Sequence, residues 1–251
     1  MILVKDLSKR FEGHQVLKGL NLSVEKGETM VIMGCSGCGK SVLLKLIIGL
    51  LKPDEGEIWI DGKQITDLTE KQMDEMRKNF GMVFQSSALF DSLTVGENVG
   101  FSLSRHTNMS REQIAQLVAE KLELVGLSGS EDAMPADLSG GMKKRVSVAR
   151  AVSMDPAVIL YDEPTTGLDP VMAEEVNHLI ARLHQNLEVT SLVVTHDMRS
   201  AFSIATRMAM LHDGRIIETG TPEEFRQSAE PVVRRFLDAG YYRNFGKKLR
   251  F

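Results

Sequence analysis

The chain has 251 residues, 43% of them hydrophobic and 25% charged, a composition typical of globular proteins that predicts one large domain. Thirty lysines and arginines against 34 aspartates and glutamates leave a net charge of −4, so no overall basic field attracts nucleic acid, and we expect no nucleic-acid partner. The N-terminus lacks the apolar core of a signal peptide. The most apolar run, residues 42–51, has about half the length that spans a bilayer. We therefore expect a cytosolic chain that reaches a membrane only through a partner.

The N-terminal part of the chain predicts an antiparallel layer followed by the start of a buried sheet. Residues 2–8, 17–24 and 56–62 are typical of antiparallel strands. Residues 29–33, TMVIM, form the short apolar run of a strand that is buried on both faces. An apolar helix is predicted to follow over residues 43–50.

A G-x-x-x-x-G-K-S pattern lies between this strand and this helix. Its glycines let successive backbone N–H groups converge on phosphate oxygens, and the helix adds the positive end of its dipole. Lys40 is expected to reach the β- and γ-phosphates, and the Ser41 hydroxyl to bind Mg²⁺. The pattern predicts nucleotide binding without choosing among ATPases, GTPases and kinases. The other residues of the predicted nucleotide-binding loop are Gly34, Cys35, Ser36, Gly37, Cys38, Gly39 and Val42.

The two cysteines of the chain, Cys35 and Cys38, give this loop a second interpretation as a C-x-x-C motif. No second cysteine pair and no nearby histidine completes a zinc site, which argues against structural zinc. A redox role stays open, because a helix N-terminus lowers a thiol pKa and would activate Cys38. The alternative that we favour is that both thiols fill variable positions of the phosphate loop.

The middle of the chain predicts buried parallel strands, at residues 80–85, 157–163 and 191–196, that alternate with helices. Between the first two of these strands the pattern is helical. Ser110 and Gln113 form a predicted capping box, followed by apolar residues on one helix face. These residues are expected to belong to an inserted helical subdomain.

Two further motifs carry chemistry. The strand at residues 157–161 ends in Asp162 and Glu163, which places both carboxylates at the edge of the sheet where ligands of open α/β folds bind. Asp162 is expected to hold Mg²⁺ through water and Glu163 to polarise the attacking water. For an isolated Asp-Glu pair a strand cap would be the default, but a phosphate loop and an apolar strand precede this pair. Ser139, Gly140 and Gly141 open a helix whose N-terminus suits phosphate, with a simple N-cap as the alternative.

The C-terminal part predicts a hairpin, at residues 208–220, that turns at Asp213-Gly214. The tail that follows is basic and aromatic. It is either a solvated terminus or a docking segment for another subunit. Its aromatic and basic residues are Tyr241, Tyr242, Arg243, Phe245, Lys247, Lys248, Arg250 and Phe251.

Taken in order, these motifs resemble the nucleotide-binding subunit of ATP-binding cassette (ABC) transporters. The resemblance implies an α/β P-loop NTPase fold of ABC type, with a mixed or parallel sheet core, an N-terminal antiparallel β layer and an inserted helical subdomain. It places one ABC ATPase domain at residues 1–228, the helical subdomain at about 86–155, and a C-terminal helix and tail at 229–251. The matching motifs are Gly34 to Ser41, Gln85 after an apolar strand, LSGGM at 138–142, ILYDEP at 159–164, GLD at 167–169 and His196 after LVVT.

The resemblance also implies an ATPase that uses ATP and Mg²⁺, and it assigns roles to single residues. Gln85 would sense Mg²⁺ and the lytic water, and Glu163 would be the general base. His196 would contact the γ-phosphate, and Phe11 would stack on adenine. Without the resemblance, Phe11 would be a core residue, Gln85 a surface residue and His196 a strand-end histidine. Two copies would pair head to tail, so that residues 139–141 of one close over ATP held by the other.

A closer resemblance is to the ATPase subunit of Mce-type lipid transporters, the group that includes the Mla phospholipid system. It rests on FQSSALFDSLTVGENVGF at 84–101 and LSGGMKKRVSVARA at 138–151. Met142 departs from the glutamine usual in the superfamily but agrees with this subgroup. Val42 stands where a threonine is usual, which removes one side-chain contact to the nucleotide. The resemblance implies a peripheral subunit on the cytoplasmic face of the inner membrane, bound to an integral-membrane permease through Ser86 to Leu93.

Two alternatives share the same motifs. One is the ATPase of a transporter for another solute, and the other is a soluble ABC ATPase that drives no transport, such as the energising subunit of an iron-sulfur assembly scaffold. No residue of this chain is expected to contact the transported lipid, so the lipid and the direction of transport are not encoded here.

Overall fold

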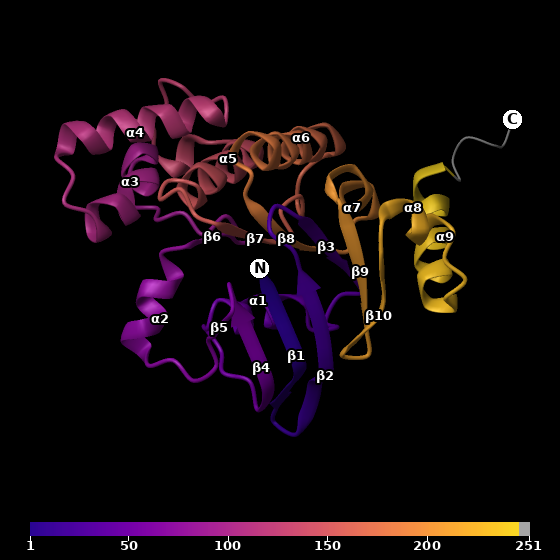
Figure 1. Ribbon diagram of the computed structural model, residues 1–251. Helices are drawn as coiled ribbons and strands as arrows, with labels where there is room; N and C mark the ends of the chain where they lie inside the picture. The colour runs from indigo at the N-terminus through magenta and orange to yellow at the C-terminus, as the bar shows by residue number, and fades with distance from the viewer. Residues whose placement is uncertain (246–251) are drawn as a thin grey trace, which may run out of the picture. The chain divides into compact units, whose positions relative to one another are not determined.

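The computed structural model describes the backbone of residues 1–245 and the side chains of residues 1–238 (Figure 1). The chain forms two compact units. The terminal unit consists of Met1–Asp67 together with the chain from Leu192 onward, and the central unit is Leu68–Ser191. The predicted tail side chains, from Tyr241 to Phe251, lie outside the described residues.

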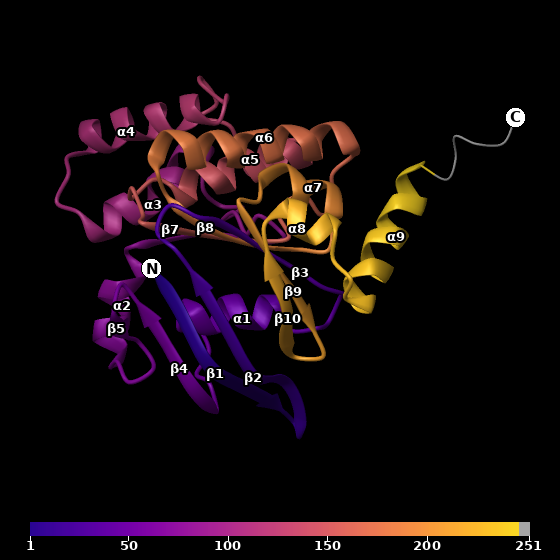
Figure 2. The same cartoon turned by 45° about the vertical axis from the view of Figure 1, so that its right-hand side comes forward.

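The terminal unit begins with the predicted antiparallel sheet. Its strands are β1 (Ile2–Phe11), β2 (His14–Val24), β4 (Glu55–Ile60) and β5 (Lys63–Gln64), in the order β2-β1-β4-β5. Figures 1 and 2 show β2, β1 and β4 side by side. Along β1 the side chains of Ile2 and Val4 are buried, and the pairing register then shifts before Leu7. Asp6 lies in this irregularity with a φ of 47°, so that Leu7 still points into the core.

The second sheet of the terminal unit carries the phosphate loop. Its order is β10-β9-β3-β8, formed by β10 (Arg215–Gly220), β9 (Arg207–His212), β3 (Thr29–Met33) and β8 (Thr190–Thr195), whose first two residues belong to the central unit. All five residues of β3 are buried, and β3 pairs in parallel with β9. The β9–β10 hairpin turns at Asp213 and Gly214, both with positive φ, as predicted.

Four helices complete the part of the terminal unit that the structure describes. These are α1 (Lys40–Ile47), α7 (Met198–Ile204), α8 (Pro222–Arg226) and α9 (Pro231–Phe245). Helix α1 buries Leu43, Leu44, Leu46 and Ile47, which confirms the apolar helix predicted after the loop. Among the described residues, no helix combines the length and the apolar character that crossing a bilayer requires.

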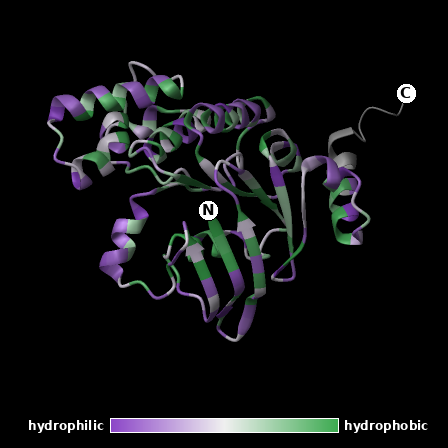
Figure 3. Cartoon of the chain, viewed as in Figure 1, coloured by the Kyte–Doolittle hydropathy of each residue, from purple (hydrophilic) through white to green (hydrophobic). Residues whose placement is uncertain are grey.

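The central unit contains the predicted helices and two parallel strands. Strand β6 (Phe80–Val83) pairs in parallel with β7 (Val158–Asp162). The helices are α2 (Glu70–Arg77), α3 (Val95–His106), α4 (Arg111–Leu124), the short 3-10 helix η1 (Pro135–Asp137), α5 (Gly140–Ala151) and α6 (Pro170–Leu187). Figure 3 shows hydrophilic and hydrophobic residues alternating along α4 and α6, as on helices that bury one face.

Two local contacts shape the central unit. The capping box at the start of α4 is confirmed, because the Gln113 N–H donates to Ser110 Oγ and the Ser110 N–H donates to Gln113 Oε1. The end of α5 lies directly on β6, since a Cβ added to Gly81 would be 2.3 Å from the Ala151 carbonyl oxygen. The compact unit also includes β6, β7 and α6, so it is larger than the helical subdomain predicted at about residues 86–155, whose limits stay a prediction.

Candidate active site

The phosphate loop runs from the end of β3 to the start of α1. Gly34 is buried, and a Cβ there would be 2.5 Å from the Leu211 carbonyl oxygen of β9, so no side chain fits. Gly39 precedes α1 with a φ of 107°, which other residues rarely adopt. The first glycine is therefore required by space and the last by backbone conformation, and together they shape the loop around the helix N-terminus.

Lys40 lies within the curve of this loop. Its side chain is almost fully buried, and Nζ donates hydrogen bonds to the Gly34 carbonyl at 2.8 Å and the Cys35 carbonyl at 3.0 Å. Ser41, half-buried, is the second residue of α1. The site thus combines a buried ammonium, a backbone shaped by glycines and a hydroxyl at a helix N-terminus. This combination fits a nucleoside triphosphate with Mg²⁺. Bound Mg²⁺ would offset the negative charge of the phosphates.

Cys38 does not have the activated thiol that its helix N-terminus was expected to produce. Burial raises its pKa to about 11, and the nearby Lys40 charge, which acts in the opposite direction, does not outweigh burial. Cys35 is exposed. The expectation of a lowered Cys38 pKa is therefore wrong, which removes the reason for expecting this thiol to be activated.

The terminal unit also holds His196 and Phe11. His196 follows β8, the neighbour of β3 in the sheet, and its side chain is exposed. The next residue, Asp197, caps α7 by accepting a hydrogen bond from the Arg199 N–H at 3.0 Å. Phe11 ends β1 with 40% of its surface exposed, and Lys9 Nζ lies 5.5 Å from the ring centroid. Phe11 is thus no core residue, and its ring is accessible for stacking.

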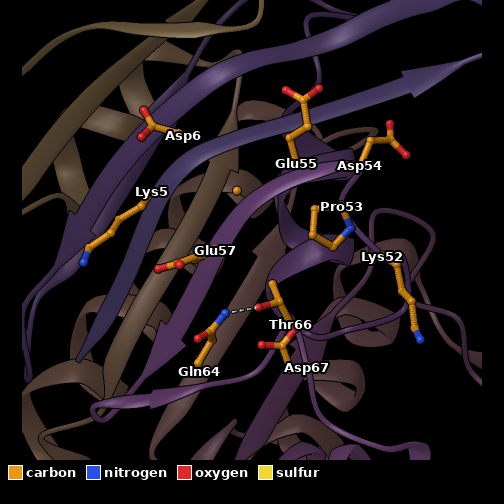
Figure 4. Close-up of a pocket in the computed structure, with 11 residues that line it drawn as sticks. Lys5, Asp6, Lys52, Pro53, Asp54, Glu55, Glu57, Gln64, Thr66 and Asp67 are labelled. Carbon is orange, nitrogen blue, oxygen red and sulfur yellow. Dashed lines mark hydrogen bonds between the residues drawn. The ribbon is translucent and has the colours of Figure 1, made fainter.

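A hollow of about 630 Å³ lies elsewhere in the terminal unit, and Figure 4 shows the side chains around it. Gln64 Nε2 donates to Thr66 Oγ1 at 2.8 Å on its wall. Five carboxylates and two lysines line it, and none of the predicted site residues does. Its carboxylates would repel a triphosphate, so this hollow does not suit a nucleotide. The charged lining residues are Lys5, Asp6, Lys52, Asp54, Glu55, Glu57 and Asp67.

The carboxylates of the central unit lie at the end of β7. Asp162 and Glu163 are each only 7% exposed. Glu163 has a φ of 48° and begins a turn in which the Thr166 N–H donates to its carbonyl, while Thr166 Oγ1 donates to its Oε2 at 3.3 Å. A buried carboxylate on a sharp turn after a buried strand is fixed in direction, as a general base must be.

Lys144, a residue of α5 that the motif analysis did not single out, faces these carboxylates. Its Nζ donates to the Gln85 carbonyl at 2.5 Å and to the Phe84 carbonyl at 3.3 Å. Burial lowers its pKa to about 8, although the charges of Asp162 and Glu163 act to raise it. Gln85 itself follows β6 with an exposed side chain. Lys144 thus lies between the Gln85 segment, which it holds by hydrogen bonds, and the carboxylates of Asp162 and Glu163.

The signature residues stand at the start of α5. Ser139 is the N-cap, with Oγ accepting from the Met142 N–H at 3.2 Å, which confirms that it opens a helix. Gly140 is exposed, whereas a Cβ added to Gly141 would be 2.2 Å from Met172 Cε. The Met172 N–H in turn donates to Asp169, the N-cap of α6. The exposed backbone of Gly140 at this helix start leaves room for an anion, so the N-cap and the phosphate-binding interpretations are compatible.

A glycine-shaped loop lies between a buried strand and a helix, and a second buried strand ends in Asp-Glu. These features define a P-loop nucleoside triphosphatase. The family model described as ABC transporter matches residues 17–166, and the chain belongs to this family.

Relatives and solved structures agree with this assignment. The chain is 44% identical to the "Intermembrane phospholipid transport system ATP-binding protein MlaF" of Haemophilus influenzae, over 94% of this chain and 90% of that protein. It is 42% identical to the "Probable ribonucleotide transport ATP-binding protein mkl" of Mycobacterium leprae, over 94% and 68%. A dimeric post-hydrolysis state of the ATP-binding cassette MJ0796, bound to ADP and Pi, is 34% identical with a TM-score of 0.82, covering 88% of this chain and 99% of that one.

The predicted fold class is therefore confirmed as the ABC-type P-loop fold. The chain is an ATPase that works with ATP and Mg²⁺. The dimeric cassettes among its structural relatives support pairing with a second copy of itself.

Proposed function

We propose that the chain is the ATP-hydrolysing subunit of a membrane phospholipid transporter, held peripherally at the cytoplasmic face of the inner membrane. The observation that carries this proposal is the 44% identity to the H. influenzae phospholipid transport protein, which extends over 90% of that protein. A chloroplastic Arabidopsis thaliana relative named TRIGALACTOSYLDIACYLGLYCEROL 3, 42% identical over 94% of this chain, also carries a lipid in its name.

Within this function, the residues of the terminal unit bind the nucleotide. Phe11 stacks on adenine, while the backbone N–H groups of residues 34–42 and the Lys40 ammonium hold the phosphates. Ser41 contributes a hydroxyl ligand for Mg²⁺, and His196 contacts the γ-phosphate. The burial of Lys40 supports its part, because a charge in a water-poor site attracts phosphate more strongly than one in solvent.

The residues of the central unit supply the hydrolytic step. Glu163 would accept a proton from the attacking water, Asp162 would hold Mg²⁺ through water, and Gln85 would sense both. The buried, turn-fixed carboxylate of Glu163 supports its assignment as the base. In the head-to-tail pair that we propose, Ser139, Gly140 and Gly141 of one subunit close over the ATP of the other, and the exposed start of α5 supports this role.

The permease is proposed to bind the segment Ser86 to Leu93. Phe90 is 44% exposed in this segment, and its ring centroid lies 4.7 Å from that of Phe101. The side chains of Leu89 and Leu93 are half-buried. An exposed aromatic ring on a supported loop fits an interface anchor, since such residues carry much of the energy of protein interfaces.

A different solute is the alternative within the same family. The chain is 40% identical to the "Methionine import ATP-binding protein MetN" of Carboxydothermus hydrogenoformans and 42% identical to the ribonucleotide-named protein mkl, so the cassette alone does not select the solute.

Co-purification of the wild-type chain from detergent-solubilised membranes tests the function, with identification of the bound subunit and of its lipid. We expect a permease with bound phospholipid. The Phe90→Ala variant should stay folded and bind ATP. Its binding free energy for the permease should weaken by about 2 kcal/mol, so less permease should co-purify with it. Recovery of a soluble scaffold, or of a permease that binds a polar solute, would contradict the lipid proposal.

A further inference from the structure

The segment from Phe84 to Thr94 contains no helix or strand after β6, yet side chains from other parts of the central unit hold most of its carbonyls. Ser87 and Ala88 both have positive φ, 64° and 47°, although neither is glycine. Such backbone conformations persist only where surrounding groups fix them. Side chains from other elements of the central unit must therefore hold this segment in place.

Two cations of α5 hold the first half of the segment. Lys144 Nζ donates to the Phe84 and Gln85 carbonyls at 3.3 and 2.5 Å. Arg150 donates from its two terminal nitrogens to the Ser87 carbonyl at 2.9 Å and the Ala88 carbonyl at 2.7 Å. Four carbonyls within five residues thus depend on one helix, the helix that begins at the signature residues 139–141.

Arg150 continues this connection to the proposed permease anchor. Its guanidinium carbon lies 5.8 Å from the centroid of the Phe90 ring, within the range of a cation–π contact. Asn98 of α3, which is completely buried, then fixes the second half of the segment. Its side chain accepts from the Phe90 N–H and donates to the carbonyls of Phe90, Leu93 and Thr94.

Lys144 is only 3% exposed, and Arg150 is half-buried. A hydrogen bond from a cation to a carbonyl is stronger than one between neutral groups, so the loss of these contacts would weaken the hold of α5 on the segment. The contacts are thus firm enough to transmit a displacement of the helix to the loop.

Building on the proposed function, we propose that Lys144 and Arg150 are positioning residues that join the signature helix α5 to the permease-contact segment, so that the two move together during the ATPase cycle. Lys144 sets where the Gln85 segment lies beside Asp162 and Glu163. Arg150 passes the position of α5 on to Phe90. Neither side chain needs to touch ATP for this role.

Amide hydrogen exchange and steady-state ATPase kinetics on the full chain test this proposal. The variants are Lys144→Met and Arg150→Met, and the control is Lys121→Met. Lys121 is also a largely buried lysine of the central unit, but it pairs with the Asp155 side chain and not with the segment. In both test variants the amides of Ser87, Phe90 and Leu93 should exchange at least about tenfold faster, with no such change in the control.

The kinetic results should separate the two cations. Lys144→Met should lower kcat about tenfold while KM changes less than about threefold, because nucleotide binding is left intact. Arg150→Met should keep the basal kcat within about twofold but lose the change in rate that the membrane subunit produces, and Arg150→Lys should restore part of it. A structural role alone would not split kcat from KM or respond to this conservative replacement.

Unchanged exchange at these three amides, or an unchanged kcat in Lys144→Met, would overturn the proposal. If a methionine variant loses its cooperative thermal transition, Lys144→Gln and Arg150→Gln replace it and are judged by the same two measurements. A wild-type chain whose ATPase never responds to a membrane subunit would contradict the proposed function, while exchange and kcat would still decide on the Lys144 and Arg150 contacts.

Discussion

The phosphate loop and the segment Phe84–Thr94 are both irregular stretches that follow a buried strand, but they are held in opposite ways. Residues 34–41 take their shape from glycine and from a lysine of the same loop, at separations of five and six residues. The segment after β6 takes its shape from Lys144 and Arg150, about sixty residues away in the sequence. The phosphate loop is locally determined, whereas the Phe84–Thr94 segment depends on tertiary packing. Substitutions that affect the two regions should therefore have different consequences for activity and stability.

Lys40→Ala should have the largest effect, because it removes the buried cation of the locally determined loop. We expect turnover to fall at least about 100-fold, as when a preorganised donor to a charged transition state is lost. Lys45→Ala, an exposed lysine on the same helix, is the matched control. ATP hydrolysis and nucleotide affinity measure the effect. Unchanged hydrolysis would remove the phosphate-loop assignment.

Glu163→Gln tests the catalytic group at the end of β7. The amide cannot accept a proton from water, so hydrolysis should slow by about 100-fold or more while MgATP still binds. An ATP-bound dimer should then accumulate, which gel filtration with and without MgATP would detect. If turnover stays normal, another residue is the base. If turnover slows and no dimer forms, the head-to-tail pairing is contradicted.

Asn98→Ala should reveal how far the second half of the Phe84–Thr94 segment depends on one buried side chain outside it. It removes four hydrogen bonds from a completely buried site, so we expect a loss of about 3 kcal/mol in the free energy of unfolding. Urea denaturation measures this loss. The replacement of exposed Asn79 by alanine is the control, and an equal effect in both would show that the segment is not held in this way.

The double variant Cys35→Ser, Cys38→Ala should have the smallest effect. The phosphate loop acts through backbone N–H groups and Lys40, so ATPase activity should stay within about threefold of wild type. In the wild type, a thiol reagent at pH 7 should modify exposed Cys35 before Cys38, whose raised pKa of about 11 keeps it protonated. Turnover that follows redox potential only in the wild type would restore the redox interpretation.

The same contrast explains what the sequence could predict. The strand, loop and helix at residues 29–47, the capping box at Ser110 and the turn at Asp213-Gly214 depend on residues a few positions apart, and all three are confirmed. Lys144 could not be found in this way, because a lysine is usually exposed and its carbonyl partners are 59 and 60 residues away. The Cys38 pKa was predicted wrongly because the helix dipole is a local effect, whereas burial depends on the whole fold.

The contact between Gly81 and the end of α5 sets how closely this helix approaches β6. With no side chain at residue 81, the β6 backbone packs directly against the Ala151 carbonyl, and any side chain there would push the end of the helix away. Arg150, which holds the Ser87 and Ala88 carbonyls, is the residue next to this close contact, whereas the signature glycines lie at the other end of α5. A single glycine of β6 therefore controls where the Arg150 side chain starts from.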